Sequence, residues 1–206
     1  KNYLKKTKID QIYLCAARVG GIYANNRFPA NFIYENLMIQ TNIIHYAFEN
    51  NIKKILFLGS SCIYPKEINR PMIESDLLTG KLEPTNSPYA LAKITAIEIG
   101  KSLRLQYGHK ILNLMPTNLY GPGDNFSETE SHVIPGLIAR MHKAKELNQE
   151  TFSIWGSGHP LREFLYVDDL SYAIEFLVNK DIDEDLLNIG SGVEISILEL
   201  SQLIKK

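Results

Sequence analysis

Three residues, Ser60, Tyr89 and Lys93, carry side chains that can together protonate a substrate oxygen. Tyr89 and Lys93 are four residues apart in a segment with helical periodicity, so a helix places them on one face, one turn apart. The ammonium group favours the phenolate and is expected to lower the pKa of Tyr89. A serine within reach can polarise the same oxygen. The pattern predicts a proton-transfer site if the fold brings the three residues together.

Two elements must position these groups. The apolar run Lys54–Leu58 predicts a buried strand, which places Ser60 where that strand ends. Ser87 is expected to cap a long helix, with Pro88 at the first helical position. Tyr89 then lies in the first turn of this helix.

Further strands and helices alternate along the chain. We expect strands over residues 11–17, 54–60, 110–115, 151–155 and 186–190, and a short one within 162–169. Helices are expected over residues 29–50, 88–107 and 132–148, from 169 to about 179, and over 197–206. This alternation predicts an α/β fold with a parallel sheet.

Small polar residues follow three of the predicted strands: Gly20-Gly21, Ser60-Ser61-Cys62 and Thr117-Asn118. In parallel sheets ligands bind outside the carboxyl ends of the strands, so the three stretches are expected to line one cleft. A dinucleotide-binding sheet also needs a glycine-rich first turn and a ribose-binding residue, and neither occurs in these residues. We therefore expect the first strands of such a sheet to be absent from this chain.

Composition narrows the class of protein. The chain has 206 residues, of which 45% are apolar, and a formal net charge of −1. This balance gives no electrostatic reason to expect a nucleic-acid or membrane partner. The two cysteines, Cys15 and Cys62, form no disulfide framework and lack metal-ligand spacing, so no metal site is expected. A reduced, cytoplasmic setting is the expectation.

The segment 29–50 has apolar residues on two sides of the predicted helix. One stripe consists of Ile33, Leu37, Ile44 and Phe48, and the other of Phe32, Ile39, Ile43 and Tyr46. A helix on a sheet needs only one such face. We therefore expect the second stripe to contact another subunit, in a homodimer that uses helices 29–50 and 88–107.

Several stretches carry a more specific resemblance, which runs over nearly the whole chain. They are Arg18–Asn26, Gly59–Lys66, Glu83–Lys93, Met115–Phe126, Ser131–Pro135 and Trp155–Asp169. Ser60, Tyr89 and Lys93 resemble the catalytic set of the short-chain dehydrogenase/reductases. The longer stretches resemble an extended branch, the GDP-L-fucose synthase family of GDP-4-keto-6-deoxy-D-mannose 3,5-epimerase/4-reductases. The resemblance implies a Rossmann-like doubly wound parallel sheet with a small C-terminal substrate domain, both incomplete in this chain.

The resemblance implies two reactions in one site. Epimerisation at C3 and C5 of the keto-sugar would use a thiol and an imidazole, at Cys62 and His132. Hydride transfer from NADPH to C4 would use Tyr89 as proton donor, with Lys93 lowering its pKa and holding the nicotinamide ribose. Ser60 would hydrogen-bond the same oxygen. Ser61 is an alternative to Ser60, and the match to the family favours Ser60.

The resemblance also implies binding residues. The cofactor would contact Leu58, Gly59, Ser60, Ser61, Lys93, Pro116, Thr117, Asn118, Leu119 and His132. The GDP-sugar would contact Asn118, Arg140, Trp155 and Arg162. An arginine suits a diphosphate because its guanidinium makes bidentate charge-assisted hydrogen bonds. Trp155 is equally well interpreted as a core residue, and Arg140 as a surface charge.

The expected organisation has two parts. Residues 1–120 would form the remainder of the NADP-binding domain, and residues 121–206 part of the substrate domain, with about 163–190 returning to the first.

The main alternative function is a C4-reductase for another GDP-4-keto sugar, such as a GDP-heptose, without epimerisation. A sugar-nucleotide 4,6-dehydratase is less favoured because Cys62 stands where that chemistry needs a carboxylate. A non-catalytic nucleotide-binding protein or a structural domain would not need Ser60, Tyr89 and Lys93 together.

Overall fold

The main sheet of the protein is parallel and has four strands. The computed structural model describes residues 3, 6–127 and 130–206. The order across the sheet is β1 (Gln11–Leu14), β2 (Lys54–Leu58), β3 (Ile111–Pro116) and β6 (Leu186–Ile189). All neighbours are parallel, so the four carboxyl ends lie at one edge. The expected parallel α/β fold is confirmed.

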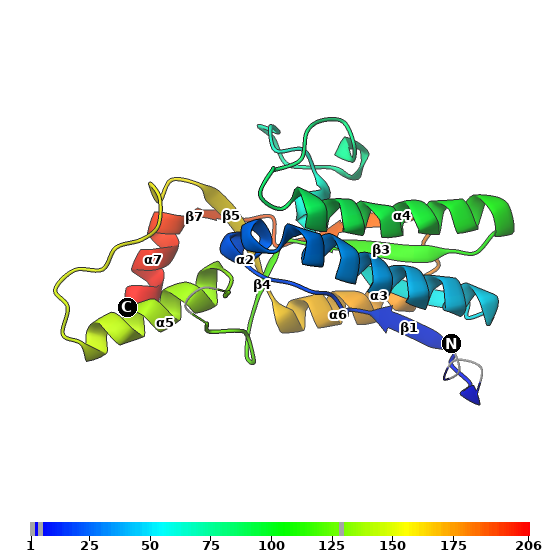
Figure 1. Ribbon diagram of the computed structural model, residues 1–206, viewed down its shortest axis with the longest axis horizontal. Helices are drawn as coiled ribbons and strands as arrows, with labels where there is room; N and C mark the ends of the chain where they lie inside the picture. The colour runs from blue at the N-terminus through cyan, green and yellow to red at the C-terminus, as the bar shows by residue number, and fades with distance from the viewer. Residues whose placement is uncertain (1–2, 4–5, 128–129) are drawn as a thin grey trace.

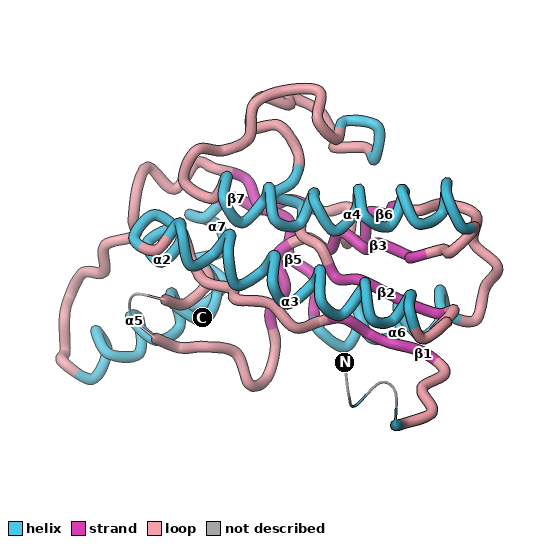
Figure 2. The backbone as a smooth tube through the Cα atoms, turned by 45° about the vertical axis from the view of Figure 1, so that its right-hand side comes forward, coloured by secondary structure: helices cyan, strands magenta, loops and turns pink. Residues whose placement is uncertain are grey.

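Helices cover both faces of this sheet. α3 (Pro29–Glu49) and α4 (Ser87–Tyr107) pack side by side on one face, and α6 (Val167–Val178) lies on the other (Figures 1 and 2). The core beneath α3 and α4 includes Ile44, Phe57 and Ala96, which are fully buried. Burial of a side chain the size of isoleucine or phenylalanine contributes about 1.5 to 3 kcal/mol, which helps to hold both helices on the sheet.

A second, smaller sheet lies beyond the carboxyl ends of the main sheet (Figure 1). Its order is β4 (Asn118–Tyr120), β5 (Leu161–Tyr166) and β7 (Glu194–Ser196). β4 and β5 are parallel, whereas β5 and β7 are antiparallel. The helices α2 (Ile22–Arg27), α5 (Val133–Glu146) and α7 (Ile197–Lys205) lie at this end of the molecule (Figure 1).

The long connection from β2 to α4 is ordered by ion pairs. It contains two short 3-10 helices, Ser61–Ile63 and Glu74–Asp76. Arg70 contacts the buried Asp76 at 2.5 Å, and Lys66 contacts Glu83 at 3.0 Å. Ile68, Leu77 and Leu82 of the same connection pack against the core, so apolar contacts as well as ion pairs hold it in place.

The predicted helices and most predicted strands are confirmed, with three differences. Residues 151–155 are not a strand and form no part of the sheet β4-β5-β7. Ser87 is not the cap of α4: Asn86 precedes the helix, and its carbonyl accepts the first backbone hydrogen bond, from Ala90. α2, β4 and β7 were not predicted, and they are three to six residues long.

The interpretation of α3 as a helix with two separate apolar faces is wrong in part. Phe32, assigned to the outer stripe, is 1% exposed and meets the ring of Tyr89 edge-on within the chain. Ile39 and Ile43 of the same stripe pack against the core. The reason is that α3 contacts α4 as well as the sheet, which requires a wider apolar surface.

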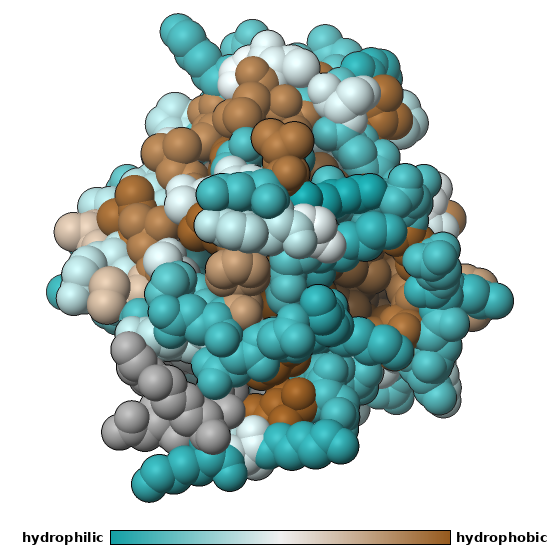
Figure 3. Space-filling model, turned by 90° about the vertical axis from the view of Figure 1, so that its right-hand side faces the viewer, coloured by the Kyte–Doolittle hydropathy of each residue, from teal (hydrophilic) through white to brown (hydrophobic). Residues whose placement is uncertain are grey.

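The opposite end of the sheet carries many hydrophilic side chains. The face at the right of Figure 1 also has a group of apolar ones in the upper part of the view in Figure 3. Arg104 and Lys110 pair there with Asp183, at 2.7 and 2.9 Å.

Among the helices that the structure describes, none has the length and apolar character needed to span a membrane.

Candidate active site

Ser60 lies two residues beyond β2 and begins a tight turn. Its backbone is extended, and its hydroxyl accepts a hydrogen bond from the Cys62 N–H at 3.4 Å. The turn packs closely on β3, since a Cβ atom on Gly59 would lie 2.0 Å from the terminal methyl of Met115. The Ser60 N–H donates to the Met115 sulfur at 3.3 Å. The absence of a side chain at Gly59 therefore leaves room for Met115 of β3, which contacts the backbone of Ser60.

Tyr89 and Lys93 face this turn from α4. The Lys93 ammonium donates a hydrogen bond to the Leu58 carbonyl at 2.8 Å, which ties α4 to the last residue of β2. The same nitrogen is 4.6 Å from the centre of the Phe57 ring and 5.6 Å from that of Tyr89. Lys93 is 2% exposed. The predicted helix and strand thus bring Ser60, Tyr89 and Lys93 to one place.

Burial changes the proton affinities of both side chains. Desolvation lowers the pKa of Lys93 from 10.5 to about 8. Desolvation, with a smaller effect from Cys62, raises the pKa of Tyr89. The expected lowering of the Tyr89 pKa is therefore not found in this structure, because burial of the phenol determines the direction of the shift. The phenol keeps its proton at neutral pH, as a proton donor must.

Cys62 belongs to the same cluster. Its thiol is close enough to act electrostatically on both Tyr89 and Lys93. Burial raises its pKa from 9.0 to about 11, although Ser60 and Lys93 act in the opposite direction. The neutral thiol is therefore the resting form near neutral pH. A single strand end thus holds a hydroxyl and a thiol beside a phenol and an ammonium group.

Thr117 and Asn118 follow β3 at the same edge of the sheet. The Thr117 hydroxyl oxygen is buried and has no hydrogen-bond partner among the residues that the structure describes. Asn118 is exposed, and its side-chain amide donates to the Glu163 carbonyl at 2.9 Å. The neighbouring Pro116 ends β3, and Leu119 lies in β4. An unsatisfied buried hydroxyl at a strand end is typical of a ligand-binding position.

The glycine loop after β1 contacts the segment that leads to His132. The Gly21 N–H donates to the Glu130 carbonyl at 3.3 Å, and a Cβ atom on Gly21 would lie 2.7 Å from the Ser131 carbonyl oxygen. The Asn25 side-chain amide holds the loop by donating to the carbonyls of Gly20 and Gly21. His132 is exposed and precedes the first turn of α5. In the described residues it makes no hydrogen bond to Cys62 or Tyr89.

Arg140, Trp155 and Arg162 lie farther along, at the second sheet. The Arg140 guanidinium is 4.4 Å from the ring centre of Trp155 and 5.5 Å from that of Phe152. Trp155 is 67% exposed, so its interpretation as a core residue is wrong. Arg162 is exposed in β5, with one guanidinium nitrogen bonded to the Leu161 carbonyl. Aromatic rings thus hold Arg140 at the surface, with its remaining donors free of acidic partners among the described residues.

Two positioning residues were missed from the sequence, Met115 and Asn25. Met115 supports Ser60 from the neighbouring strand, and Asn25 holds the glycine loop. Gly59 and Gly20-Gly21 were the available signals, because glycine commonly marks a close approach of another chain segment. Nothing in the sequence says which residue makes that approach.

Comparison with known proteins agrees with this arrangement. Residues 1–190 match the model of the NAD dependent epimerase/dehydratase family. The chain belongs to this family. A GDP-L-fucose synthase from Escherichia coli (strain K12) is 51% identical over 214 residues, which cover 100% of this chain and 67% of the relative. The chain spans 63% to 67% of the length of three curated relatives.

Two solved structures of similar proteins have bound NADP. A GDP-L-fucose synthetase from Naegleria fowleri bound to NADP has a TM-score of 0.88 and 30% identity, over 98% of this chain and 63% of that one. A GDP-mannoheptose C4 reductase from Campylobacter jejuni with NADP bound has a TM-score of 0.86 and 33% identity, over 99% and 71%. Both similarities cover nearly all of this chain.

Membership of the NAD dependent epimerase/dehydratase family requires residues that fit a nicotinamide dinucleotide. Lys93 uses one of its three N–H donors on Leu58, which leaves two for ribose hydroxyls. The unpartnered hydroxyl of Thr117 lies at the neighbouring strand end. These groups fit the nicotinamide half of the cofactor. The glycine-rich turn that binds the pyrophosphate in this fold is not among the 206 residues.

Proposed function

We propose that this chain is part of an NADPH-dependent epimerase-reductase that converts GDP-4-keto-6-deoxy-D-mannose to GDP-L-fucose. The observation that carries the proposal is the placement of Cys62 in the strand-end turn with Ser60, within electrostatic reach of Tyr89 and Lys93. A reductase needs the last three of these groups, and a thiol beside them adds a second proton-transfer group. The identity of about 51% to a GDP-L-fucose synthase supports the same substrate.

Tyr89 and Ser60 would act on the oxygen at C4. The bound reduced nicotinamide supplies the hydride. Tyr89 would donate its proton to the oxygen that gains negative charge, and its raised pKa keeps that proton available. The Ser60 hydroxyl would hydrogen-bond the same oxygen. Lys93 would hold the nicotinamide ribose through the N–H donors that Leu58 does not use.

Cys62 and His132 would carry out the epimerisations. Protons next to a ketone are acidic once the developing enolate is stabilised, and the groups that hold the C4 oxygen provide that stabilisation. Inversion requires removal of a proton on one face of the sugar and its return on the other, so two groups are needed. Cys62 lies at the strand end, and His132 lies at the start of α5, beyond the carboxyl ends of the main sheet (Figure 1).

The second sheet and α5 would bind the GDP portion. Arg140 and Arg162 suit a diphosphate, because guanidinium groups make charge-assisted hydrogen bonds to phosphate oxygens. Trp155 presents an exposed ring next to Arg140. Asn118 would contact the sugar and the cofactor from β4. The cofactor would also be contacted by Leu58, Gly59, Ser61, Pro116, Thr117, Leu119 and His132. Residues 1–120 would thus belong to the cofactor domain and 121–206 to the substrate domain, with about 163–190 returning to the first.

A C4-reductase of a GDP-heptose is the second candidate. The observation in its favour is the likeness to the GDP-mannoheptose C4 reductase, with a TM-score of 0.86. Such an enzyme shares Ser60, Tyr89 and Lys93 but does not need epimerisation. Cys62 and His132 favour the first candidate.

The test supplies the full-length enzyme with NADPH and GDP-4-keto-6-deoxy-D-mannose in deuterated water. We expect GDP-L-fucose with deuterium at C3 and C5. Oxidation of NADPH without deuterium at those carbons would support the reductase alone and contradict the epimerase assignment. Mass spectrometry and NMR of the product distinguish the two results.

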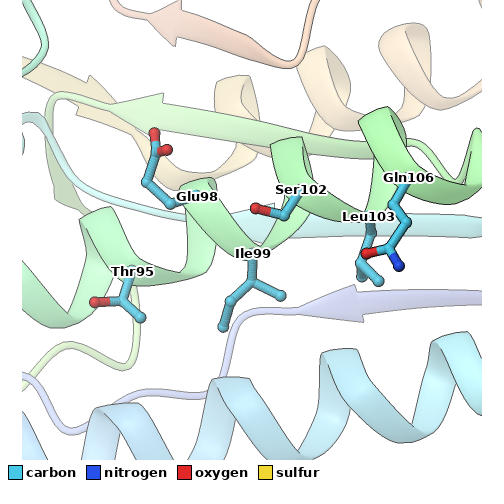
Figure 4. A pocket seen from close by; sticks show the side chains of 6 residues that line it. All are labelled: Thr95, Glu98, Ile99, Ser102, Leu103 and Gln106. Atoms are coloured by element: carbon cyan, nitrogen blue, oxygen red, sulfur yellow. The ribbon is translucent and has the colours of Figure 1, made fainter.

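We also propose that the protein forms a homodimer through α3 and α4. A surface cavity of about 280 Å³ runs along α4 and is lined by Thr95, Glu98, Ile99, Ser102, Leu103 and Gln106 (Figure 4). Neighbouring exposed apolar residues are Tyr34 and Met38 of α3 and Leu91 of α4. Sedimentation equilibrium at micromolar concentration is expected to give a dimer, and a monomer would contradict this proposal.

A further inference from the structure

Glu163 lies where the two sheets meet and has no part in the function proposed above. Its carboxylate oxygen Oε1 accepts a hydrogen bond from the Gly192 N–H at 2.6 Å and is 3.3 Å from the Ser191 hydroxyl, which donates to it. Its backbone carbonyl accepts from the Asn118 amide at 2.9 Å. One residue of β5 therefore holds both the loop after β6 and the first residue of β4.

The loop after β6 is shaped to receive this carboxylate. A Cβ atom on Gly190 would lie 2.2 Å from Glu163 Oε1 and 3.0 Å from the Thr117 side-chain methyl. Both distances are shorter than van der Waals contact, so a side chain at position 190 would displace one of these groups. Glycine at position 190 allows the Glu163 carboxylate to approach the backbone of the loop, where a side chain would otherwise lie.

A second carboxylate lies nearby without these contacts. Glu194 of β7 stands opposite Glu163 in the antiparallel pair. Among the described residues, the side-chain hydrogen bonds to the loop 190–192 come from Glu163 and not from Glu194. Glu194 therefore provides a matched comparison for Glu163.

The neighbours of Glu163 indicate what role it has. Arg162 precedes it in β5, and Asn118, bonded to its carbonyl, pairs in register with Phe164. Both Arg162 and Asn118 are exposed at the end of the molecule where the ligand would bind. The proposed proton-transfer groups lie in the turn after β2, on α4 and at the start of α5 instead, and Glu163 makes no hydrogen bond to them among the described residues.

We propose that Glu163 is a positioning residue for sugar-nucleotide binding. By holding the loop 190–192 at the junction of the sheets, its carboxylate fixes the segment of β5 that carries Arg162 and the Asn118 amide bonded to it. This inference rests on the proposed function for the nature of the ligand. It follows that loss of the carboxylate weakens substrate binding and leaves the proton-transfer step intact.

The test compares Glu163→Ala, Glu163→Gln and the matched control Glu194→Gln in the full-length enzyme. For Glu163→Ala we expect the KM of the GDP-keto sugar to rise about tenfold, since hydrogen bonds to a charged group are lost. The kcat is expected to stay within about twofold of wild type. Glu163→Gln should recover part of the loss, because an amide oxygen still accepts from Gly192. Glu194→Gln should leave both constants unchanged.

Hydrogen exchange provides a readout that does not depend on activity. Exchange at the Gly192 amide is expected to accelerate in Glu163→Ala and to stay at the wild-type rate in Glu194→Gln. An unchanged KM, an equal loss of kcat and kcat/KM without rescue by glutamine, or unchanged exchange at Gly192 would overturn the inference. If the wild-type enzyme fails to act on any GDP-keto sugar, the proposed function is wrong, and exchange at Gly192 alone then decides whether Glu163 holds the loop.

Discussion

The Lys93 ammonium donates a hydrogen bond to the Leu58 carbonyl at 2.8 Å, and this contact fixes the helix with the phenol against the strand with the serine. Lys93 is almost fully buried, and desolvation lowers its pKa to about 8. The Lys93 ammonium therefore begins to lose its proton only slightly above neutral pH. That property leads to two measurable consequences.

The first consequence concerns the pH dependence of the reaction. If reduction needs the Lys93 ammonium, kcat/KM is expected to fall as the pH rises through about 8, because the group loses its proton there. The Tyr89 phenol does not account for this decrease, since burial raises its pKa. A kcat/KM for reduction that stays constant up to pH 9 would contradict a role for the charged form.

The second consequence concerns stability. The unfolded chain keeps the proton on Lys93 up to about pH 10.5, whereas the folded chain loses it at about 8. Through Lys93 the unfolded state therefore binds more protons above pH 8, and the free energy of unfolding should rise between about pH 8 and 9, by up to about 1.4 kcal/mol per unit. Above pH 9 the raised pKa of Cys62 acts in the opposite direction. We expect the rise to disappear in Lys93→Met, measured by urea unfolding from pH 7 to 9.

The control for the stability measurement is Lys101→Met, because Lys101 is exposed and pairs with Glu98. Its curve is expected to run parallel to that of the wild type. A pH slope in Lys93→Met equal to that of the wild type would contradict the lowered pKa of Lys93.

A substitution in the glycine loop 20–21 should change the position of His132 by moving the segment before it. In Gly21→Ala the new Cβ would lie 2.7 Å from the Ser131 carbonyl oxygen, so the segment before His132 must shift. We expect deuterium exchange at C3 and C5 to slow about tenfold or more, with a smaller effect on NADPH oxidation. Gly20→Ala is the comparison variant, since the nearest atoms to its Cβ would be those of Ala24 and Phe32 and not those of Ser131.

If Gly20→Ala and Gly21→Ala slow exchange equally, the contact with Ser131 does not position His132. Circular dichroism and thermal unfolding of the two variants show whether either one has lost its fold. The comparison is informative because the two substitutions differ only in what the added methyl group meets.

The guanidinium of Arg140 offers a separate test of sugar-nucleotide binding. Arg140→Ala is expected to raise the KM for the GDP-sugar about tenfold to a hundredfold, since it removes charge-assisted hydrogen bonds to phosphate. Arg140→Lys should recover only part of this, because an ammonium group cannot make the bidentate contact or the same stacking on Trp155. Calorimetric titration with GDP measures both effects, and equal affinity in all three proteins would exclude Arg140 from the site.

The centre of the site was predictable from sequence because local patterns determine it. Ser60 follows a strand that an apolar run reveals, and Tyr89 and Lys93 share a face in any helix that starts near Ser87. Parallel strands bring their carboxyl ends together, so the meeting of these residues follows from the fold class. The resemblance of whole motifs to one family then supplied Cys62 and His132.

The remainder depends on tertiary contacts that local patterns do not encode. The burial of Phe32 depends on α3 packing against α4, and periodicity alone placed this residue on the outer stripe. The raised pKa of Tyr89 depends on how much of the phenol is buried. The role of Glu163 depends on Gly190 and Asn118, which are far from it in sequence but adjacent at the junction of the sheets.

Deuterium exchange in Tyr89→Phe and Cys62→Ala would separate the two reactions that we propose for one pocket. With the GDP-keto sugar and NADPH in deuterated water, Tyr89→Phe should abolish reduction and still place deuterium at C3 and C5. Cys62→Ala should do the reverse, with loss of exchange while reduction of the ketone persists. If Cys62→Ala exchanges and reduces at the wild-type rates, the thiol has no part in the chemistry and the account of a shared pocket is wrong.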